Sequence, residues 1–185
     1  MLTLNFNPFP TIATDRLILR QLTDGDGPEI FILRSDERIL KFIDIAKANT
    51  IGDALAFIRK INNFIHENEC IYWGIALKDH DKLIGTICLW NILKEHYRAE
   101  VGFAMHPDQQ GKGLMNEALA ALLNYAFSKM KLHSVEGRVH PANTASIKLM
   151  ERNKFIREAY FKEDYYCNGR FGDTAVYSRL SGVEA

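Results

Sequence analysis

The chain has 185 residues, a length that suits one folded unit, and we expect a single domain over residues 1–185. Hydrophobic residues make up 47% and charged residues 25%, which is typical of a globular protein able to bury a core. The 23 basic and 23 acidic side chains balance, so overall charge gives no support for a protein that binds nucleic acid or an anionic membrane.

Targeting and redox signals are also sparse. The first residues lack the basic start and apolar run of a secretory signal, and no apolar stretch approaches the roughly 20 residues of a membrane span. Cys70, Cys88 and Cys167 are odd in number and far apart, so they indicate neither a disulfide framework nor a metal cluster. We therefore expect a reducing, cytoplasmic location and no metal site.

The first half of the chain combines short strands with helices. Thr50 suits the N-cap of a helix, because apolar residues recur at helical spacing after it. Two of the next strands are joined by Lys78–Asp81, whose residue types favour a hairpin turn. The predicted elements are a strand over 16–21, helices over 24–34, 37–43 and 51–67, and strands over 71–77, 82–92 and 98–105.

The second half alternates between helix and strand. A loop with Gly111 and Gly113 opens into a helix whose apolar residues, from Leu114 to Phe127, share one face. The remaining predicted elements are a strand over 134–139, a helix over 145–152, and a hairpin of strands over 156–166 and 174–180. Strands followed by alternating helix and strand predict an α+β fold, a mixed sheet with helices packed on it.

The glycine loop is the most informative segment. An apolar strand ends before Pro107, and glycines then allow the backbone to approach a ligand closely. The first N–H groups of the following helix lack intrahelical partners and lie at the positive end of its dipole. These features predict a site for a phosphate-bearing cofactor. The loop is not a Walker A loop, because His106 stands at the first glycine position, and Asn116 replaces the third glycine of a dinucleotide fingerprint.

Four segments together resemble one family. Residues 110–115, Gln-Gly-Lys-Gly-Leu-Met, resemble the pyrophosphate loop of the GCN5-related N-acetyltransferases (GNAT family), although Met115 replaces the usual Gly or Ala. Residues 14–20 look like the opening strand of the RimJ/RimL-type branch, the ribosomal-protein N-terminal acetyltransferases. Residues 143–155 resemble the second cofactor helix, and residues 168–180 the closing hairpin.

The resemblance implies a mostly antiparallel sheet of about seven strands flanked by helices. In this family the strand before the loop and the strand after its helix splay apart, and the pantetheine arm of acetyl-CoA enters between them. The implied cofactor-binding residues are the backbone N–H groups of two strand residues, the loop, and an amide at the second helix: Phe103, Met105, Gln110, Gly111, Lys112, Gly113, Leu114, Met115 and Asn143. Asn143 also suits the N-cap of its helix, and both roles are compatible.

Glu100 is the candidate general base. Acyl transfer to an amine requires removal of a proton from the amine and hydrogen-bond donors for the oxyanion. A carboxylate at the start of the strand before the loop faces the acceptor amine in many family members. The alternative is that Glu100 only pairs with Arg98 or Arg138.

Ser146 is the candidate general acid. The family's usual proton donor is a tyrosine at a position that Met150 occupies here, and RimJ/RimL-type enzymes have a serine at the position of Ser146. The alternative is that Ser146 only occupies a first helical turn, where serine is favoured. Some relatives use an acidic residue on the next strand, which falls at Tyr165. Lys154 replaces the family's glycine, from which we expect a turn without a left-handed residue.

The acceptor is less defined by sequence. Phe42, Tyr72, Trp73, Trp90 and Tyr97 are either acceptor-site or core residues, whereas His106 and His140 are expected to be structural. We expect an N-acetyltransferase whose acceptor is a protein N-terminal amine. The alternatives are a small-molecule amine, such as a polyamine, an aminoglycoside or a metabolite, and a non-catalytic acyl-CoA-binding sensor. A monomer and a homodimer are both compatible with the sequence.

Overall fold

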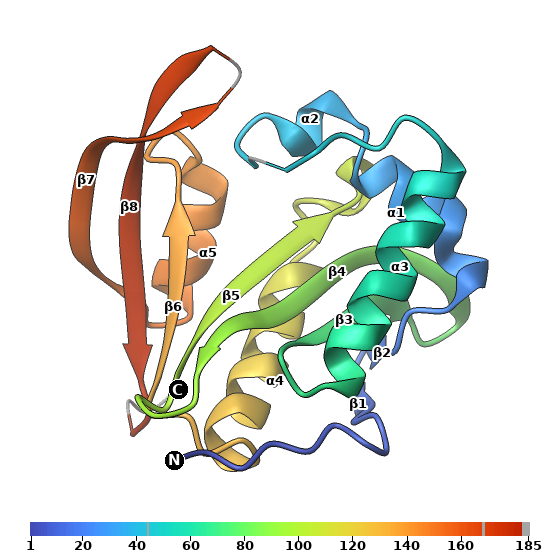
Figure 1. The fold of residues 1–185 in the computed structure, drawn as a ribbon, viewed down its shortest axis with the longest axis horizontal. Coiled ribbons are helices and arrows are strands. Elements are labelled where there is room, and N and C mark those ends of the chain that lie inside the picture. Colours follow the sequence, from blue (N-terminus) through green and yellow to red (C-terminus); the bar gives the residue numbers. More distant parts are fainter. Residues whose placement is uncertain (44, 168, 183–185) are drawn as a thin grey trace.

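The computed structural model describes residues 1–43, 45–167 and 169–182. An eight-stranded sheet with the order β1-β2-β3-β4-β5-β6-β8-β7 forms its centre (Figure 1). The strands are β1 (Ile12–Ala13), β2 (Leu17–Arg20), β3 (Ile71–Leu77), β4 (His80–Leu93), β5 (Arg98–Met105), β6 (Ser134–Val139), β7 (Ile156–Cys167) and β8 (Arg170–Leu180). The helices are η1 (Asp24–Asp26), α1 (Gly27–Leu33), α2 (Glu37–Leu40), α3 (Ile51–His66), η2 (Pro107–Gln109), α4 (Leu114–Ser128) and α5 (Thr144–Arg152).

Seven neighbouring strand pairs form this sheet, and six of them are antiparallel. The exception is β5 with β6, which is parallel, because η2 and α4 carry the chain back to the starting end of β5. The glycine loop follows β5 and η2 and precedes α4, so it lies at the far end of β5, beside the gap between β5 and β6 (Figure 1).

The main core lies between the sheet and α4. Residues at helical spacing on α4 are buried, including Leu119 and Leu122, which are completely inaccessible to solvent. They pack in one cluster with sheet residues such as Leu19, Ile75 and Leu89. Burial of each such side chain contributes about 1.5–3 kcal/mol, so α4 is fixed firmly against the sheet.

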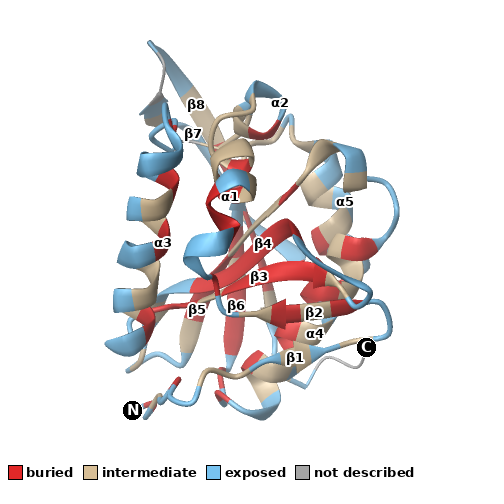
Figure 2. Cartoon of the chain, turned by 90° about the vertical axis from the view of Figure 1, so that its right-hand side faces the viewer, coloured by how far each residue is buried: buried red, intermediate tan, exposed pale blue. Residues whose placement is uncertain are grey.

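Helices α1 and α3 cover the opposite face. Ile30, Ile58 and Leu83 belong to a second buried cluster on this side. Figure 2 shows the buried residues concentrated on the central strands, while the outer surface of α3 is exposed. Helix α3 begins at the predicted cap: Thr50 Oγ1 accepts from Asp53 N at 3.1 Å, and an Asp53 carboxylate oxygen accepts from Thr50 N at 2.9 Å.

The predicted α+β fold and its mostly antiparallel sheet are confirmed, with the two-residue β1 as an additional strand. Strands β3, β5 and β6 have the predicted bounds. Helix α2 is shorter than predicted and ends at Leu40, and Ile43 N then donates to Leu40 O in a turn. Strand β8 begins at Arg170, four residues earlier than predicted, and directly follows Gly169, a turn residue with a left-handed conformation (φ +79°).

The end of α5 corrects one expectation. Lys154 has φ +63°, so the turn does contain a left-handed residue although glycine is absent. Lys154 N donates to Glu151 O at 3.0 Å, and Phe155 N donates to Met150 O at 3.1 Å. These two bonds define a Schellman motif, whose geometry requires the left-handed residue whatever its side chain. The expectation was wrong because the bonds that end the helix outweigh the local preference of lysine.

Candidate active site

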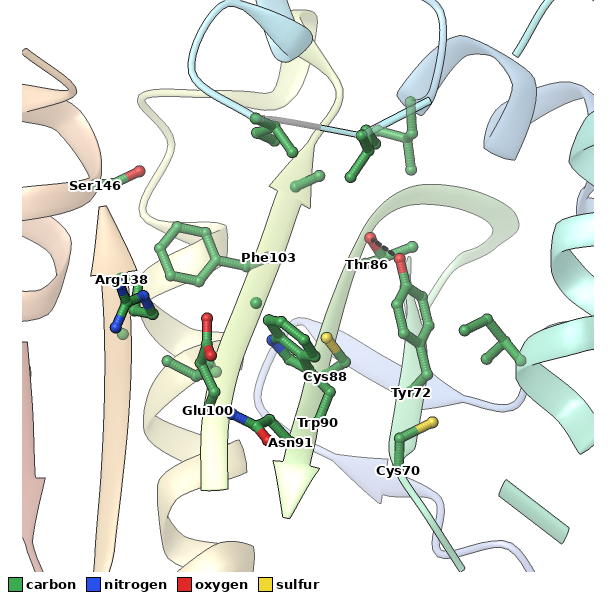
Figure 3. A pocket seen from close by; sticks show the side chains of 18 of the residues that line it. Cys70, Tyr72, Thr86, Cys88, Trp90, Asn91, Glu100, Phe103, Arg138 and Ser146 are labelled. Carbon is green, nitrogen blue, oxygen red and sulfur yellow. Dashed lines mark hydrogen bonds between the residues drawn. The ribbon is translucent and has the colours of Figure 1, made fainter. Parts of the chain in front are cut away.

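Strands β5 and β6 separate in the middle of the sheet. Their parallel register joins three residue pairs and ends at Glu100 and Glu136. Beyond this point β5 continues to Met105 and β6 to Val139, and Figure 3 shows the two strands diverging. The predicted splay between the two strands is therefore present, and Glu100 lies where it begins.

Glu100 is a buried carboxyl group with 7% of its surface exposed. Burial raises the pKa of Glu100 to about 7, and repulsion from Glu136 adds to the effect, whereas Arg138 and a hydrogen bond from Asn91 oppose it. The two predicted ion-pair partners are engaged elsewhere, because Arg98 pairs with Glu136 and Arg138 binds an oxygen of Asp164 at 3.1 Å. A carboxyl group with this pKa exchanges a proton readily near neutral pH.

Sequence reasoning missed Asn91. A register shift in β4 between Trp90 and Leu93 forms a bulge, and Asn91 within it has φ +47°. The bulge turns the Asn91 amide toward Glu100, as Figure 3 shows. An asparagine between the apolar residues Trp90 and Ile92 is the sequence signal for this bulge, because asparagine tolerates left-handed backbone better than most residues.

Ser146 lies in the first turn of α5 and lines the same cavity as Glu100. Figure 3 shows it across the gap from Phe103, near the end of β6. Its backbone N–H donates to Asn143 Oδ1 at 3.2 Å, so the capping role of Asn143 is present. The Met150 side chain is buried over β6, where a Cβ on Gly137 would come within 2.6 Å of its sulfur.

The backbone of β5 offers polar groups toward the gap. In the ladder with β4, His106 N donates to Ile84 O at 2.8 Å, and bonded pairs alternate along an antiparallel ladder. Residues 102 and 104 therefore bond to β4, whereas the backbone groups of Phe103 and Met105 point toward β6. Met105 O accepts from Gln110 Nε2 at 3.1 Å, in agreement with this orientation. An extended ligand arm could add to this edge as a strand does.

The glycine loop has the backbone that a phosphate site requires. Gly111 and Gly113 have φ +76° and +74°. A Cβ on Gly111 would meet nothing within 4 Å, and a Cβ on Gly113 would meet only an Arg16 nitrogen at 3.6 Å, so the loop surface is open. Gly113 is the N-cap of α4, which buries Leu114 and half-buries Met115. The first N–H groups of α4 therefore face an open surface at the positive end of the helix.

Cationic side chains accompany this loop. Lys112 is exposed, and its Nζ donates to Gln109 Oε1 at 2.9 Å. Arg16, from the start of the sheet, donates from Nη1 to Lys112 O at 3.1 Å. Both lie beside the open amides, and the residues present therefore fit a diphosphate group.

A cavity of about 690 Å³ extends from the gap beneath α1 and α3. Of the five candidate aromatic residues, Phe42, Tyr72 and Trp90 line it. Trp73 is fully buried in the core instead, and Tyr97 is exposed outside the cavity. The charged residues among its described lining are two arginines and two glutamates: Arg34, Arg138, Glu69 and Glu100.

The two loop histidines have structural contacts. The His106 ring accepts from Asp108 N at 3.3 Å, and the His140 ring accepts from Ala142 N at 3.0 Å. Within the described residues no group of three or more His, Cys, Asp or Glu side chains is arranged to hold a metal ion. None of the helices described is both long and apolar enough to cross a membrane.

Carboxylates on β7 reach the site only indirectly. Asp164 contacts Arg138, which lines the cavity beside Glu100. Glu163 turns at φ +52°, and its N–H donates to Asp173 at 2.8 Å. Tyr165 occupies the position of the acidic residue that some relatives use, and it packs against Gly172. Asp164 therefore influences the site through Arg138.

Comparison with known proteins gives a consistent assignment. A family model described as "Acetyltransferase (GNAT) domain" matches residues 16–156. The chain is 34% identical over 170 residues to the Uncharacterized N-acetyltransferase YoaA of Bacillus subtilis, covering 92% of this chain and 96% of that protein. It is 27% identical to the [Ribosomal protein uS5]-alanine N-acetyltransferase of Escherichia coli, covering 90% and 88%.

A solved structure adds a ligand-bound example. Spermidine N-acetyltransferase from Vibrio cholerae, in complex with CoA and spermine, superposes with a TM-score of 0.80 at 27% identity, covering 90% of this chain and 96% of that one. Similar proteins thus act on a protein alanine in one case and bind a polyamine in another.

Proposed function

The chain belongs to the GNAT acetyltransferase family, and on this premise we propose that it acetylates the N-terminal amine of a protein. Acetyl-CoA is the co-substrate and supplies an activated thioester. The observation that carries the proposal is the position of Glu100, a carboxyl group with a pKa of about 7 where β5 and β6 diverge into a large cavity. The RimJ/RimL-type branch fits this acceptor.

Glu100 takes the role of general base. In its ionised form it accepts a proton from the acceptor ammonium, which leaves a neutral amine able to attack the acetyl carbon. Asn91 holds the carboxyl group by a hydrogen bond, and Arg138 favours the ionised form. A positioned proton transfer of this kind typically contributes about a hundred- to ten-thousand-fold in rate.

Ser146 takes the role of general acid. The amine attacks the thioester carbon to give a tetrahedral oxyanion, which collapses to the amide as the C–S bond breaks. The Ser146 hydroxyl donates a proton to the departing sulfur and regains one from the newly acylated nitrogen, which carries a surplus proton after the attack. Support comes from its place on the cavity wall, with its backbone held by Asn143, and from Met150, whose side chain has no proton to give.

The remaining predicted residues hold the co-substrate. The amides of residues 110–115 at the start of α4 bind the diphosphate, with Lys112 adding a positive charge. The backbone groups of Phe103 and Met105 bind the pantetheine arm, which adds to β5 as an extra strand would. The side-chain amide of Asn143 binds the arm from the start of α5, on the opposite side of the gap.

The cavity favours a peptide over a polyamine. A polyamine with several ammonium groups requires several carboxylates, yet the described lining of the cavity contains two glutamates and also two arginines, which would repel ammonium groups. The apolar walls of the cavity suit the side chains of the residues that follow an N-terminal amine. The buried free thiols of Cys70 and Cys88 agree with a cytoplasmic protein; the side chain of Cys167 lies outside the described part of the structure.

Free-thiol release from acetyl-CoA, measured with N-terminal peptides, spermidine and an aminoglycoside, tests the proposal. We expect peptides to be acetylated, with loss of activity in Glu100→Gln and Ser146→Ala. Glu158→Gln, on the exposed edge strand β7, is the matched control. Faster acetylation of spermidine would make a small amine the acceptor. Coenzyme A binding without turnover on any amine would favour the sensor.

A further inference from the structure

Arg34, at the C-terminal end of α1, lines the part of the cavity beneath the helices. Its guanidinium carbon lies 4.0 Å from the centre of the Phe57 ring. Its Nη2 donates to Ala46 O at 3.4 Å, the long limit of a hydrogen bond. Burial lowers the pKa of Arg34, but a guanidinium stays protonated in proteins. Arg34 is therefore a partly desolvated positive charge against an aromatic face.

The structure gives Arg34 no carboxylate partner among the described residues. Arg34 also borders a smaller hollow of about 300 Å³ that includes Asp53. One of its oxygens, Oδ2, accepts from Asn49 N and Thr50 N at 2.9 Å each, and Asp53 is not among the groups that shift the pKa of Arg34. Among the described residues nothing balances this partly desolvated charge, and an uncompensated charge is costly, so a negative group on a ligand would stabilise Arg34.

A second donor lies on the cavity floor. The Tyr72 hydroxyl donates to Thr86 Oγ1 at 3.0 Å (Figure 3), and burial raises the Tyr72 pKa, so this phenol is neutral. Because Thr86 accepts this bond, its own hydroxyl hydrogen remains available for a ligand. Tyr72 and Arg34 lie close enough for each to affect the pKa of the other. The rest of this part of the cavity, around Arg34, Tyr72 and Thr86, is lined by apolar side chains: Ile30, Leu33, Phe42, Ile43, Ile61 and Phe64.

The strand register relates this group to the reacting end. Thr86 pairs with Ala104, and Glu100 lies four residues from Ala104 on the same strand face. At about 3.3 Å per residue, the two backbone positions are roughly 13 Å apart along the sheet. An extended peptide covers this distance in about three or four residues.

We propose that Arg34 binds a carboxylate of the acceptor, so that peptides with an acidic side chain at the third or fourth residue are preferred. This inference rests on the proposed function and deepens it. One guanidinium balances a single negative charge, and a neutral hydroxyl adds one hydrogen bond, which favours a carboxylate over a doubly charged phosphate. Two N–H groups of the guanidinium bind the two carboxylate oxygens, while the guanidinium carbon lies over the Phe57 ring.

The test uses C-terminally amidated hexapeptides that begin with Ala and carry one Glu at position 2, 3, 4 or 5, each with a Gln counterpart. We measure kcat/KM by thiol release and, separately, equilibrium binding by calorimetry with coenzyme A present. The parent enzyme should prefer Glu at position 3 or 4 by at least tenfold in both measurements. Arg34→Gln should remove the preference while coenzyme A affinity stays unchanged.

Two further variants control the result. Arg59→Gln removes an exposed arginine on α3 that pairs with Asp24, and the preference should remain. Arg34→Lys keeps the charge without the planar fork, and part of the preference should remain. This variant decides the question if Arg34→Gln fails to fold.

Equal treatment of Glu and Gln peptides by the parent would overturn the inference, as would a preference that survives in Arg34→Gln. If a phosphoserine peptide bound more than tenfold tighter than the Glu peptide, the Arg34 site would be a phosphate site and the carboxylate proposal would be wrong. The proposed function fails separately: tight, Arg34-dependent binding of the Glu peptide without acetylation supports the anion site and rejects peptide acetylation.

Discussion

Arg16 and Glu117 join the segment before β2 to helix α4. Arg16 Nε contacts Glu117 Oε2 at 2.6 Å, while Arg16 N and Thr14 Oγ1 donate to Glu117 Oε1 at 2.8 and 2.6 Å. Desolvation raises the pKa of Glu117, but hydrogen bonds from Thr14 and Arg16 outweigh it and hold the pKa below its usual value. Because Arg16 also binds Lys112 O at 3.1 Å, this ion pair fixes the glycine loop from outside the sheet.

Arg16→Gln should therefore weaken coenzyme A binding by about tenfold, or ~1.4 kcal/mol, because the loop amides lose their support. Glu117→Gln should have a similar effect, and the double variant should be little worse than either single variant, since the residues act as one unit. Isothermal titration measures all three. Arg59→Gln, which breaks an exposed ion pair far from the loop, is the control. Fully additive losses would argue against a joint role.

The pKa of Glu100 predicts a pH dependence of the rate. With a pKa of about 7, kcat/KM should rise about tenfold per pH unit below 7 and level off above it, because only the ionised carboxylate accepts a proton. Glu100→Gln should be slower by about a hundredfold or more and lack this rise. The measurement is kcat/KM from pH 5.5 to 9, and coenzyme A affinity should change little. An unchanged profile in the variant would assign the base to another group.

The same pKa predicts a stability effect. Folding raises the pKa of Glu100 from 4.5 to about 7, so the group contributes stability below pH 4.5 that is lost as pH rises to 7. Relative to the parent, Glu100→Gln should gain about 1–3 kcal/mol in unfolding free energy between pH 4.5 and 8. Urea denaturation at both pH values measures this, with the exposed Glu158→Gln as control. A difference independent of pH would contradict the raised pKa.

Gly113→Asp tests the phosphate loop. Aspartate at φ +74° costs about 1 kcal/mol of backbone strain and places a negative charge at the proposed diphosphate site. Coenzyme A affinity should fall at least a hundredfold in a titration. Gly169→Asp is the matched control, since Gly169 has φ +79° with nothing within 4 Å of a Cβ, but lies beside the β7–β8 turn. It should lose similar stability and keep its affinity; a comparable affinity loss in both variants would point to general destabilisation.

Lys154→Gly should stabilise the protein. The left-handed φ of +63° costs lysine about 1 kcal/mol that glycine does not pay, and the Schellman bonds remain. Chemical denaturation should show a gain of about 0.5–1 kcal/mol. Lys154→Ala, which removes the side chain but keeps the strain, should show no gain. Equal stabilisation by both variants would mean that the lysine side chain itself is unfavourable.

The sequence alone predicted most of the elements and the backbone of the glycine loop. The bounds of β3, β5 and β6, the Thr50 cap and the glycine loop depend on hydrophobic period, capping and backbone freedom, which act within a few residues. The resemblance to the GNAT family predicts Glu100 and Ser146 as the candidate base and acid, and in the structure both line one cavity.

Only the tertiary structure decided the pKa of Glu100 and the contacts of Arg34. The pKa of Glu100 depends on burial and on Glu136, which a parallel pairing brings from another strand. Arg34 meets Phe57 because α1 and α3 cover the same sheet face. Such contacts join residues far apart in the chain, and electrostatic energies depend on distance and burial in the fold, which local sequence patterns do not encode.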